Sequence, residues 1–193
     1  TINRLLPFAY QIADLGRQWS VLVHSRMLTY AHILDLDTKF RALLSSLPIF
    51  LRPDPTLEQL PEVRQEQAQR PYLAMHRLIV FEAVNQRLLV LHRDDMCRGH
   101  HDEKFAYSTR VAVDAARTIL SCRQQIDNVH PAVQKHAAFR HHLFQAAIVL
   151  SIHLLELSHK AQGESQVAHQ LRDDIALIMN LSLIHISEPT RPR

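Results

Sequence analysis

Glycine and cysteine are both scarce in this chain. Only three glycines occur in 193 residues, at Gly16, Gly99 and Gly163. Because a β-sandwich or barrel of this size needs many tight turns, so few glycines favour helices over strands. The two cysteines, Cys97 and Cys122, are too few for a disulfide framework or for a cysteine-based zinc site. The scarcity of both residue types therefore favours an all-α fold without disulfide bonds or cysteine-based zinc sites.

A strong charge imbalance is also missing. Lys and Arg number 22 against 19 Asp and Glu, the net charge is +3, and no basic run exceeds two residues. Surfaces that bind nucleic acid usually show a clustered excess of basic residues. The most apolar stretch, residues 143–157, is shorter than the roughly 20 residues that cross a bilayer, and it is interrupted by His153 and Glu156. We therefore expect neither direct DNA binding by this chain nor a membrane segment.

What the chain does have is apolar residues at helical spacing along most of its length. Hydrophobic residues make up 47% of the sequence, enough for a sizeable core, and no segment alternates as a strand would. The pattern predicts an all-α, multi-helix domain over residues 1–181. Helices are expected at 5–34 (one long helix or two in line), from a cap at Asp37 to residue 47, and at 72–91, 105–122, 143–157 and 167–181.

Two further expectations concern packing. Residues 52–70 are rich in proline and charge, which predicts a loop. The helix at 143–157 is apolar around most of its circumference and is expected to lie centrally. We expect it to contact the helix at 72–91 and the small side chains Ala115 and Ala116, which permit close approach.

The densest group of metal-ligand side chains is His100, His101, Asp102 and Glu103. A helical metal-dependent hydrolase could use His100, His101 and Asp102 as ligands, but it needs further ligands from other helices and an open position for water. No sequence spacing supplies them. The group is more typical of a solvated turn after Gly99, so we expect these side chains to face solvent and to hold no metal.

Other candidate side chains are isolated. A di-metal carboxylate site needs two Glu-x-x-His pairs, and only one pair is present. No His-Glu-x-x-His motif, phosphate-binding loop or nucleophile elbow occurs. No catalytic, cofactor-binding or metal residue is therefore expected. The candidates rejected on these grounds are Glu156 and His159, the group His136, His141 and His142, the core thiol Cys122, and Cys97, which lies beside Arg98.

Four segments resemble the fungal-specific transcription factor domain, the helical middle region of fungal binuclear zinc-cluster regulators. They are LDLDTKFRALLSSLP (34–48), LLVLHR (88–93), RGHHDEKFAYSTRVAVDAARTIL (98–120) and HLFQAAIVL (142–150). The clearest signatures are His92 followed by Arg93 at a helix end, and Ser108 followed by the pair Ala115 and Ala116. The chain departs from the family pattern at Asp94, where many members have Pro, and at Val113, where many have Cys.

This resemblance implies a nuclear, non-enzymatic regulator of transcription by RNA polymerase II. The family's six-cysteine, two-zinc DNA-binding domain cannot be built from two cysteines, so zinc and DNA contacts are expected only in a domain absent from this chain. Candidate partners are transcriptional co-regulators, a small effector and a second copy of the chain. The alternatives are the metal-dependent hydrolase and a helical ligand-binding or scaffold domain.

The end of the chain does not continue the helical pattern. The apolar period of residues 167–181 stops there, and ISEPTRPR (186–193) resembles a translated sequencing adapter. We expect residues 182–193 to be a non-native tail. We also expect the regulatory region to be a fragment, incomplete at one or both ends.

Overall fold

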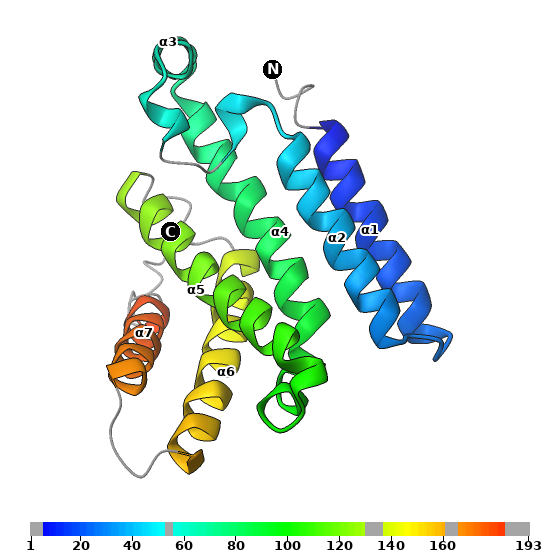
Figure 1. Cartoon of the computed structure of the whole chain (residues 1–193). Helices are drawn as coiled ribbons and strands as arrows, with labels where there is room; N and C mark the ends of the chain where they lie inside the picture. The colour runs from blue at the N-terminus through cyan, green and yellow to red at the C-terminus, as the bar shows by residue number, and fades with distance from the viewer. Residues whose placement is uncertain (1–5, 53–55, 130–136, 161–165, 184–193) are drawn as a thin grey trace, which may run out of the picture. The chain divides into compact units, whose positions relative to one another are not determined.

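A computed structural model describes residues 6–52, 56–129, 137–160 and 166–183 of the chain (Figure 1). Every regular element in these ranges is helical, so the predicted all-α fold is confirmed. Short 3-10 turns occupy Ile49–Leu51, Leu57–Gln59, Arg98–His100 and Glu103–Phe105. The α-helices are α1 (Leu6–His24), α2 (Tyr30–Ser46), α3 (Pro61–Gln69), α4 (Tyr72–Met96), α5 (Ala106–Val129), α6 (Ala137–Lys160) and α7 (Gln166–Leu183).

The chain forms two compact units, residues 1–91 and 92–193, where the sequence pattern predicts one region over 1–181. The division falls inside α4, so the last turn of this helix belongs to the second unit. Each unit is described by itself. The predicted contact between the 72–91 helix and the 143–157 helix would join the two units and stays a prediction.

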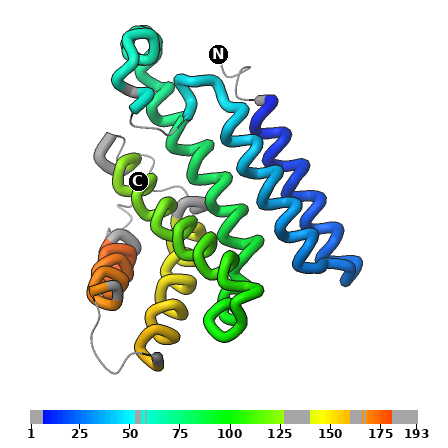
Figure 2. The backbone as a smooth tube through the Cα atoms, in the orientation of Figure 1, coloured from blue at the N-terminus to red at the C-terminus, as the bar shows by residue number. Residues whose placement is uncertain are grey.

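In the first unit, α1 and α2 form an antiparallel hairpin (Figure 2), so the expectation of one long helix or two in line is wrong. Arg26 adopts a left-handed conformation with φ 57°. Met27 N donates to Leu22 O at 3.1 Å and Arg26 N donates to Val23 O at 3.0 Å, which is the hydrogen-bond pattern that ends a helix in a Schellman motif. The Thr29 side chain then accepts from the next helix's backbone and starts α2.

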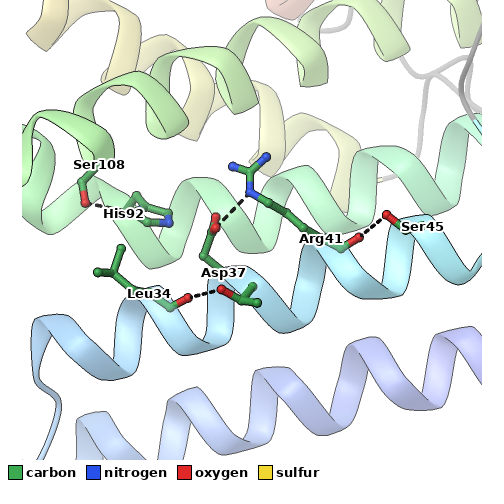
Figure 3. A network of polar contacts seen from close by, with 7 residues as sticks. Leu34, Asp37, Arg41, Ser45, His92 and Ser108 are labelled. Atoms are coloured by element: carbon green, nitrogen blue, oxygen red, sulfur yellow. Dashed lines mark hydrogen bonds and ion pairs between the residues drawn. The ribbon is translucent and has the colours of Figure 1, made fainter.

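Asp37 was expected to cap a short helix but lies in the middle of α2, where its side chain is buried (Figure 3). Arg41, one turn later, donates from Nε to Asp37 Oδ2 at 2.9 Å. Since a carboxylate is costly to bury unless it is paired, this ion pair explains how Asp37 is tolerated on the inner face of the helix. The apolar residues on that face are Ile33, Leu36, Phe40 and Leu43.

The predicted loop at 52–70 is wrong, because it contains α3 and a 3-10 turn. Pro61 occupies the start of α3, where its missing N–H would have had no helical partner in any case. Val63 is buried on this helix. The high proline content of residues 52–70 predicted an irregular loop, but Pro61 begins a helix instead. Nearby, the first unit has a core of Leu47, Leu51 and Leu73, with Phe8, Leu44, Phe50 and Val80 packed against it.

The second unit is built on α5, α6 and α7. Helix α6 packs against both α5 and α7 (Figure 1). Ala115 and Ala116 are buried on α5, and Leu143 and Leu150 are buried on α6, as expected. Helix α6 was expected to lie centrally because it is apolar around most of its circumference, but its apolar side chains Phe144, Ile148 and Leu155 are exposed.

Two remaining findings concern the expectations for membranes and for the tail. None of the described helices combines the length and the apolarity needed to cross a bilayer. Helix α7 includes Ser182 and Leu183. Residues 184–193 lie outside the described residues, so the non-native tail stays a prediction.

Candidate functional site at the junction of α4 and α5

The end of α4 is tied to the beginning of α5 by buried polar side chains. His92 Nδ1 and Ser108 Oγ are 2.9 Å apart, and both residues are fully buried (Figure 3). Thr109 Oγ1 donates to the carbonyl oxygen of Met96 at 2.7 Å. This carbonyl is one of the last four of α4, which have no partner within the helix itself. The hydrogen bond therefore satisfies the helix end and fixes the direction in which the chain leaves it.

The 3-10 turn at Arg98–His100 is held from its outer side as well. Arg98 Nη1 donates to Asp95 Oδ1 at 2.7 Å, and the guanidinium carbon lies 3.6 Å from the centre of the Phe105 ring. A cation over an aromatic face is attracted by the ring's negative surface. Phe105 is buried. Arg98 thus connects the last turn of α4 to the start of α5, and the junction is a defined structure between two helices.

His100 does not face solvent as expected, because it is half-buried against α6. Its Nε2 atom is 3.1 Å from His153 Nδ1, and the two ring centres are 4.9 Å apart. At this separation one imidazole donates to the other, which requires at least one ring to be neutral. The sequence places these residues 53 positions apart, so the pairing could not be found from spacing.

The other members of the predicted group have separate roles. His101 Nε2 is 3.3 Å from Glu156 Oε2 on α6, and the His101 side chain is mostly exposed. Asp102 accepts the backbone N–H of Lys104 at 3.0 Å and so caps the 3-10 turn at Glu103–Phe105. Glu103 is exposed in that turn. Asp102 is thus a capping residue, and the two histidines are directed towards α6.

Within the described ranges, no group of three or more His, Cys, Asp or Glu side chains has an arrangement that could hold a metal ion. The hydrolase alternative requires such a group around His100, His101 and Asp102. Nothing in the described part of the chain supports that alternative.

The remaining candidates are dispersed. Glu156 pairs with His101, whereas His159 is exposed three residues further along α6. The rings of His141 and His142 are 6.4 Å apart, and His141 Nε2 lies 3.0 Å from Gln145 Nε2. His136 lies outside the described residues. Neither Cys122, which is buried, nor Cys97, which is exposed, is part of a disulfide bond.

His153 is a residue that sequence reasoning noticed only as an interruption of an apolar stretch. Burial, the nearby His100 and the Arg117 guanidinium, in that order of size, lower the pKa of His153 from 6.5 to about 4. Arg117 itself donates from Nε to Asp174 Oδ2 on α7 at 3.2 Å. In the sequence, His153 stands out as a titratable side chain in a mostly apolar helix. The helical period does not reveal that His100 is its partner.

The lowered pKa of His153 predicts a pH dependence of stability. In the unfolded chain this imidazole takes up a proton below pH 6.5, whereas in the folded chain it does so only near pH 4. The unfolded state therefore binds more protons between these values, so stability is full above pH 6.5 and falls as the pH drops through this window. Since the group is only half-buried, we expect a loss of about 1–2 kcal/mol between about pH 7 and about pH 5.

Urea unfolding at the two pH values measures this loss, and the His153→Gln variant isolates it from the other histidines. His153→Gln should lose less stability on acidification than the unmodified chain. His159→Gln, an exposed position on the same helix, is the matched control and should behave as the unmodified chain does. Equal pH dependence of His153→Gln and the unmodified chain would contradict the assignment.

A separate groove lies in the first unit between α1 and α2. It has a volume of about 500 Å³, with Leu15, Ala42 and Leu43 as apolar lining and Tyr10 and Lys39 among the polar lining residues. The groove is open to solvent and also has Gln11, Asp14 and Ser46 in its lining, so its chemistry alone does not define a ligand.

The junction between α4 and α5 coincides with the two signature segments of the family resemblance, because His92 and Ser108 come one from each. The chain resembles part of two fungal transcription factors. It is 26% identical over 131 residues to the probable transcription factor lepB of Aspergillus flavus. It is 27% identical over 146 residues to the agnestins biosynthesis cluster transcription factor AgnL11 of Paecilomyces divaricatus.

These matches cover 66% and 75% of this chain but 23% and 20% of the two relatives, so the chain spans about a fifth of their length. No family model matches the chain. No solved structure matches it. The two similarities indicate that this chain is a transcription-factor-like region. The described residues of this region have an all-α fold.

Proposed function

We propose that this chain is a regulatory segment of a nuclear transcription factor that acts on RNA polymerase II transcription. The observation that carries the proposal is the similarity to two fungal proteins named as transcription factors, over two-thirds to three-quarters of the chain. The structure adds that the two signature segments are joined physically, through His92 and Ser108. A buried polar link of this kind maintains a specific helix arrangement, which a regulatory domain needs if it is to be recognised by other proteins.

A non-enzymatic role is favoured over the hydrolase and over a small-molecule enzyme. The polar side chains gathered around the junction pair with one another, as His100 does with His153 and His101 with Glu156. They do not converge on a common point where a substrate atom could lie. The names of both relatives also describe regulators.

The distribution of charge supports the proposal that another part of the protein contacts DNA. The basic side chains are interspersed with acidic ones along the sequence, and several of them form short-range ion pairs. Because neutralised charges release few counterions, the affinity of this segment for DNA should be small. We propose that a zinc-cluster domain supplies DNA binding and that this segment meets co-regulators or a small effector. Among the described residues, such ion pairs include Arg17–Asp14, Lys39–Asp35, Arg41–Asp37, Arg98–Asp95 and Arg117–Asp174.

A tethered reporter assay tests the proposed function. The chain fused to an unrelated DNA-binding domain should change transcription of a reporter that carries the matching site, whereas the chain alone should leave the reporter unchanged. Anisotropy titration of the chain alone at physiological salt should show DNA binding no tighter than about 1 μM, the non-specific range.

The matched control for the fusion is its Leu150→Ala variant, which disrupts the core of the second unit and should lose the effect. A fusion that is folded, bound to its site and without any effect on the reporter would contradict the regulatory role. Sequence-specific nanomolar binding by the chain alone would contradict the assignment of DNA contacts to another domain.

A further inference from the structure

Helix α6 carries an apolar stripe on the face that is turned away from α5 and α7. Phe144 is 63% exposed, Ile148 is 43% exposed and Leu155 is 58% exposed. These positions are separated by four and seven residues, which places them on one side of a helix. Ser151 lies on the same side of the helix, three residues after Ile148 and four residues before Leu155. None of the four side chains is charged. The stripe, defined here as Phe144, Ile148, Ser151 and Leu155, is therefore a continuous uncharged seam.

We propose that the stripe binds a second copy of this chain, with the two α6 helices antiparallel about a two-fold axis. The spacing of the stripe is four, three and four residues, the same when read from either end. An axis midway between Ile148 and Ser151 therefore places Phe144 opposite Leu155 of the second copy. The same axis places Ile148 opposite Ser151 of the second copy. Such a seam pairs with itself, as a closed two-fold interface requires.

Side-chain sizes agree with this pairing. Each isoleucine at position 148 would face a serine, so a large side chain enters the space left by a small one, twice across the axis. Beside the seam, Ile152 would face Ala147 of the second copy, again large against small. A parallel pairing would instead place Ile148 against Ile148 and Ser151 against Ser151, so the layer of two serines would leave a gap in the seam.

The available apolar area limits the strength of the dimer. Ile148 and Ile152 also line a groove of about 230 Å³, in which the exposed charged side chains Arg93 and Asp94 border one edge of the stripe. The stripe offers only three large exposed apolar side chains in each copy, whereas a standard interface of about 1,600 Å² uses about 20–30 residues on each side. We therefore expect a weak, reversible dimer with a Kd between about 10 μM and about 1 mM.

Sedimentation velocity of the 193-residue chain between about 5 μM and about 500 μM tests the dimer. The weight-average mass should rise from monomer towards dimer across this range. Ile148→Lys should remain monomeric throughout while keeping its helical circular dichroism, because the side chain is already partly exposed. Tyr10→Lys is the matched control, since Tyr10 is a 71% exposed aromatic side chain on α1, outside the stripe, and it should dimerise as the unmodified chain does.

Cross-linking tests the direction of the helices. In a Cys97→Ser background, a chain with Ile148→Cys is mixed with a differently tagged chain with Ser151→Cys. The disulfide between the two different chains should predominate, whereas a parallel pair would give disulfides between like chains.

A predominance of like-chain disulfides would overturn the antiparallel arrangement. A monomer at every concentration, or a dimer that Ile148→Lys leaves intact, would overturn the proposal. Protection of the α6 amides from hydrogen exchange in a monomeric longer protein, but not in this chain, would show that other residues of that protein cover the stripe, and it would also overturn the proposal.

Discussion

Replacing Leu150 by alanine should lower the free energy of unfolding by about 2–5 kcal/mol, the range for removal of a fully buried leucine side chain from a core. Leu150 is 0% exposed, on the side of α6 that packs against its neighbouring helices. The removed methyl groups leave a cavity whose lining loses its van der Waals contacts, because a packed interior relaxes only partly. Since whole-domain stability is commonly about 5–15 kcal/mol, the variant should unfold at a much lower urea concentration.

The control is Leu155→Ala, on the same helix but 58% exposed. This substitution removes the same atoms from a position that contacts solvent, so its effect should stay within about 0.5 kcal/mol. Both variants are compared by urea unfolding at low micromolar concentration, where self-association contributes little. Similar losses for the two variants would mean that α6 is not packed with Leu150 inwards.

Most of the helices could be predicted because their apolar residues follow the helical period. The expected helices at 72–91, 105–122, 143–157 and 167–181 correspond to α4, α5, α6 and α7. In each case the periodic apolar residues form a face that packs against the rest of the protein. Burial of that face stabilises the helix more than the intrinsic helix propensity of its residues does. The ends of the helices were less accurate, since fraying and short 3-10 turns carry little periodic signal.

The errors arose where a local hydrogen-bond motif decides the chain direction. The end of α1 is a Schellman motif with Arg26 at the left-handed position, whereas glycine is the usual residue there. Without a glycine, nothing in the pattern marked the reversal. In α3 the opposite happened, because Pro61 indicated a loop although proline is well tolerated at the first position of a helix.

The contacts at the candidate site were beyond sequence reasoning for a different reason. His92 and Ser108 are 16 residues apart, and His100 and His153 are 53 residues apart. Periodicity relates residues within a few turns of one helix and contains no information on which helices meet. The family resemblance marked His92 and Ser108 as signature residues, but only the structure shows that they bond to each other.

Gly99→Ala should destabilise the second unit by about 1–3 kcal/mol or more, as overpacking of a closely fitted site does. A β-carbon at Gly99 would lie 2.2 Å from Thr109 Oγ1 and 2.4 Å from the carbonyl oxygen of Phe105. Thr109 could turn away only by giving up its hydrogen bond to Met96 O. The Phe105 carbonyl belongs to the backbone and cannot rotate aside without displacing the start of α5. The added methyl group therefore separates the two ends of the junction between α4 and α5.

Gly16→Ala is the matched control for the same change. A β-carbon there would lie 3.6 Å from the Arg87 side chain, an ordinary van der Waals distance, and Gly16 is inside α1. Because alanine favours a helix interior by about 1 kcal/mol over glycine, Gly16→Ala should be neutral or stabilising. Thermal unfolding of the two variants gives opposite shifts if Gly99 is required by the close approach at the junction. If Gly99→Ala is tolerated as well as Gly16→Ala, the junction is looser than described, and the hydrogen bond from Thr109 to Met96 cannot be what fixes α5 against the end of α4.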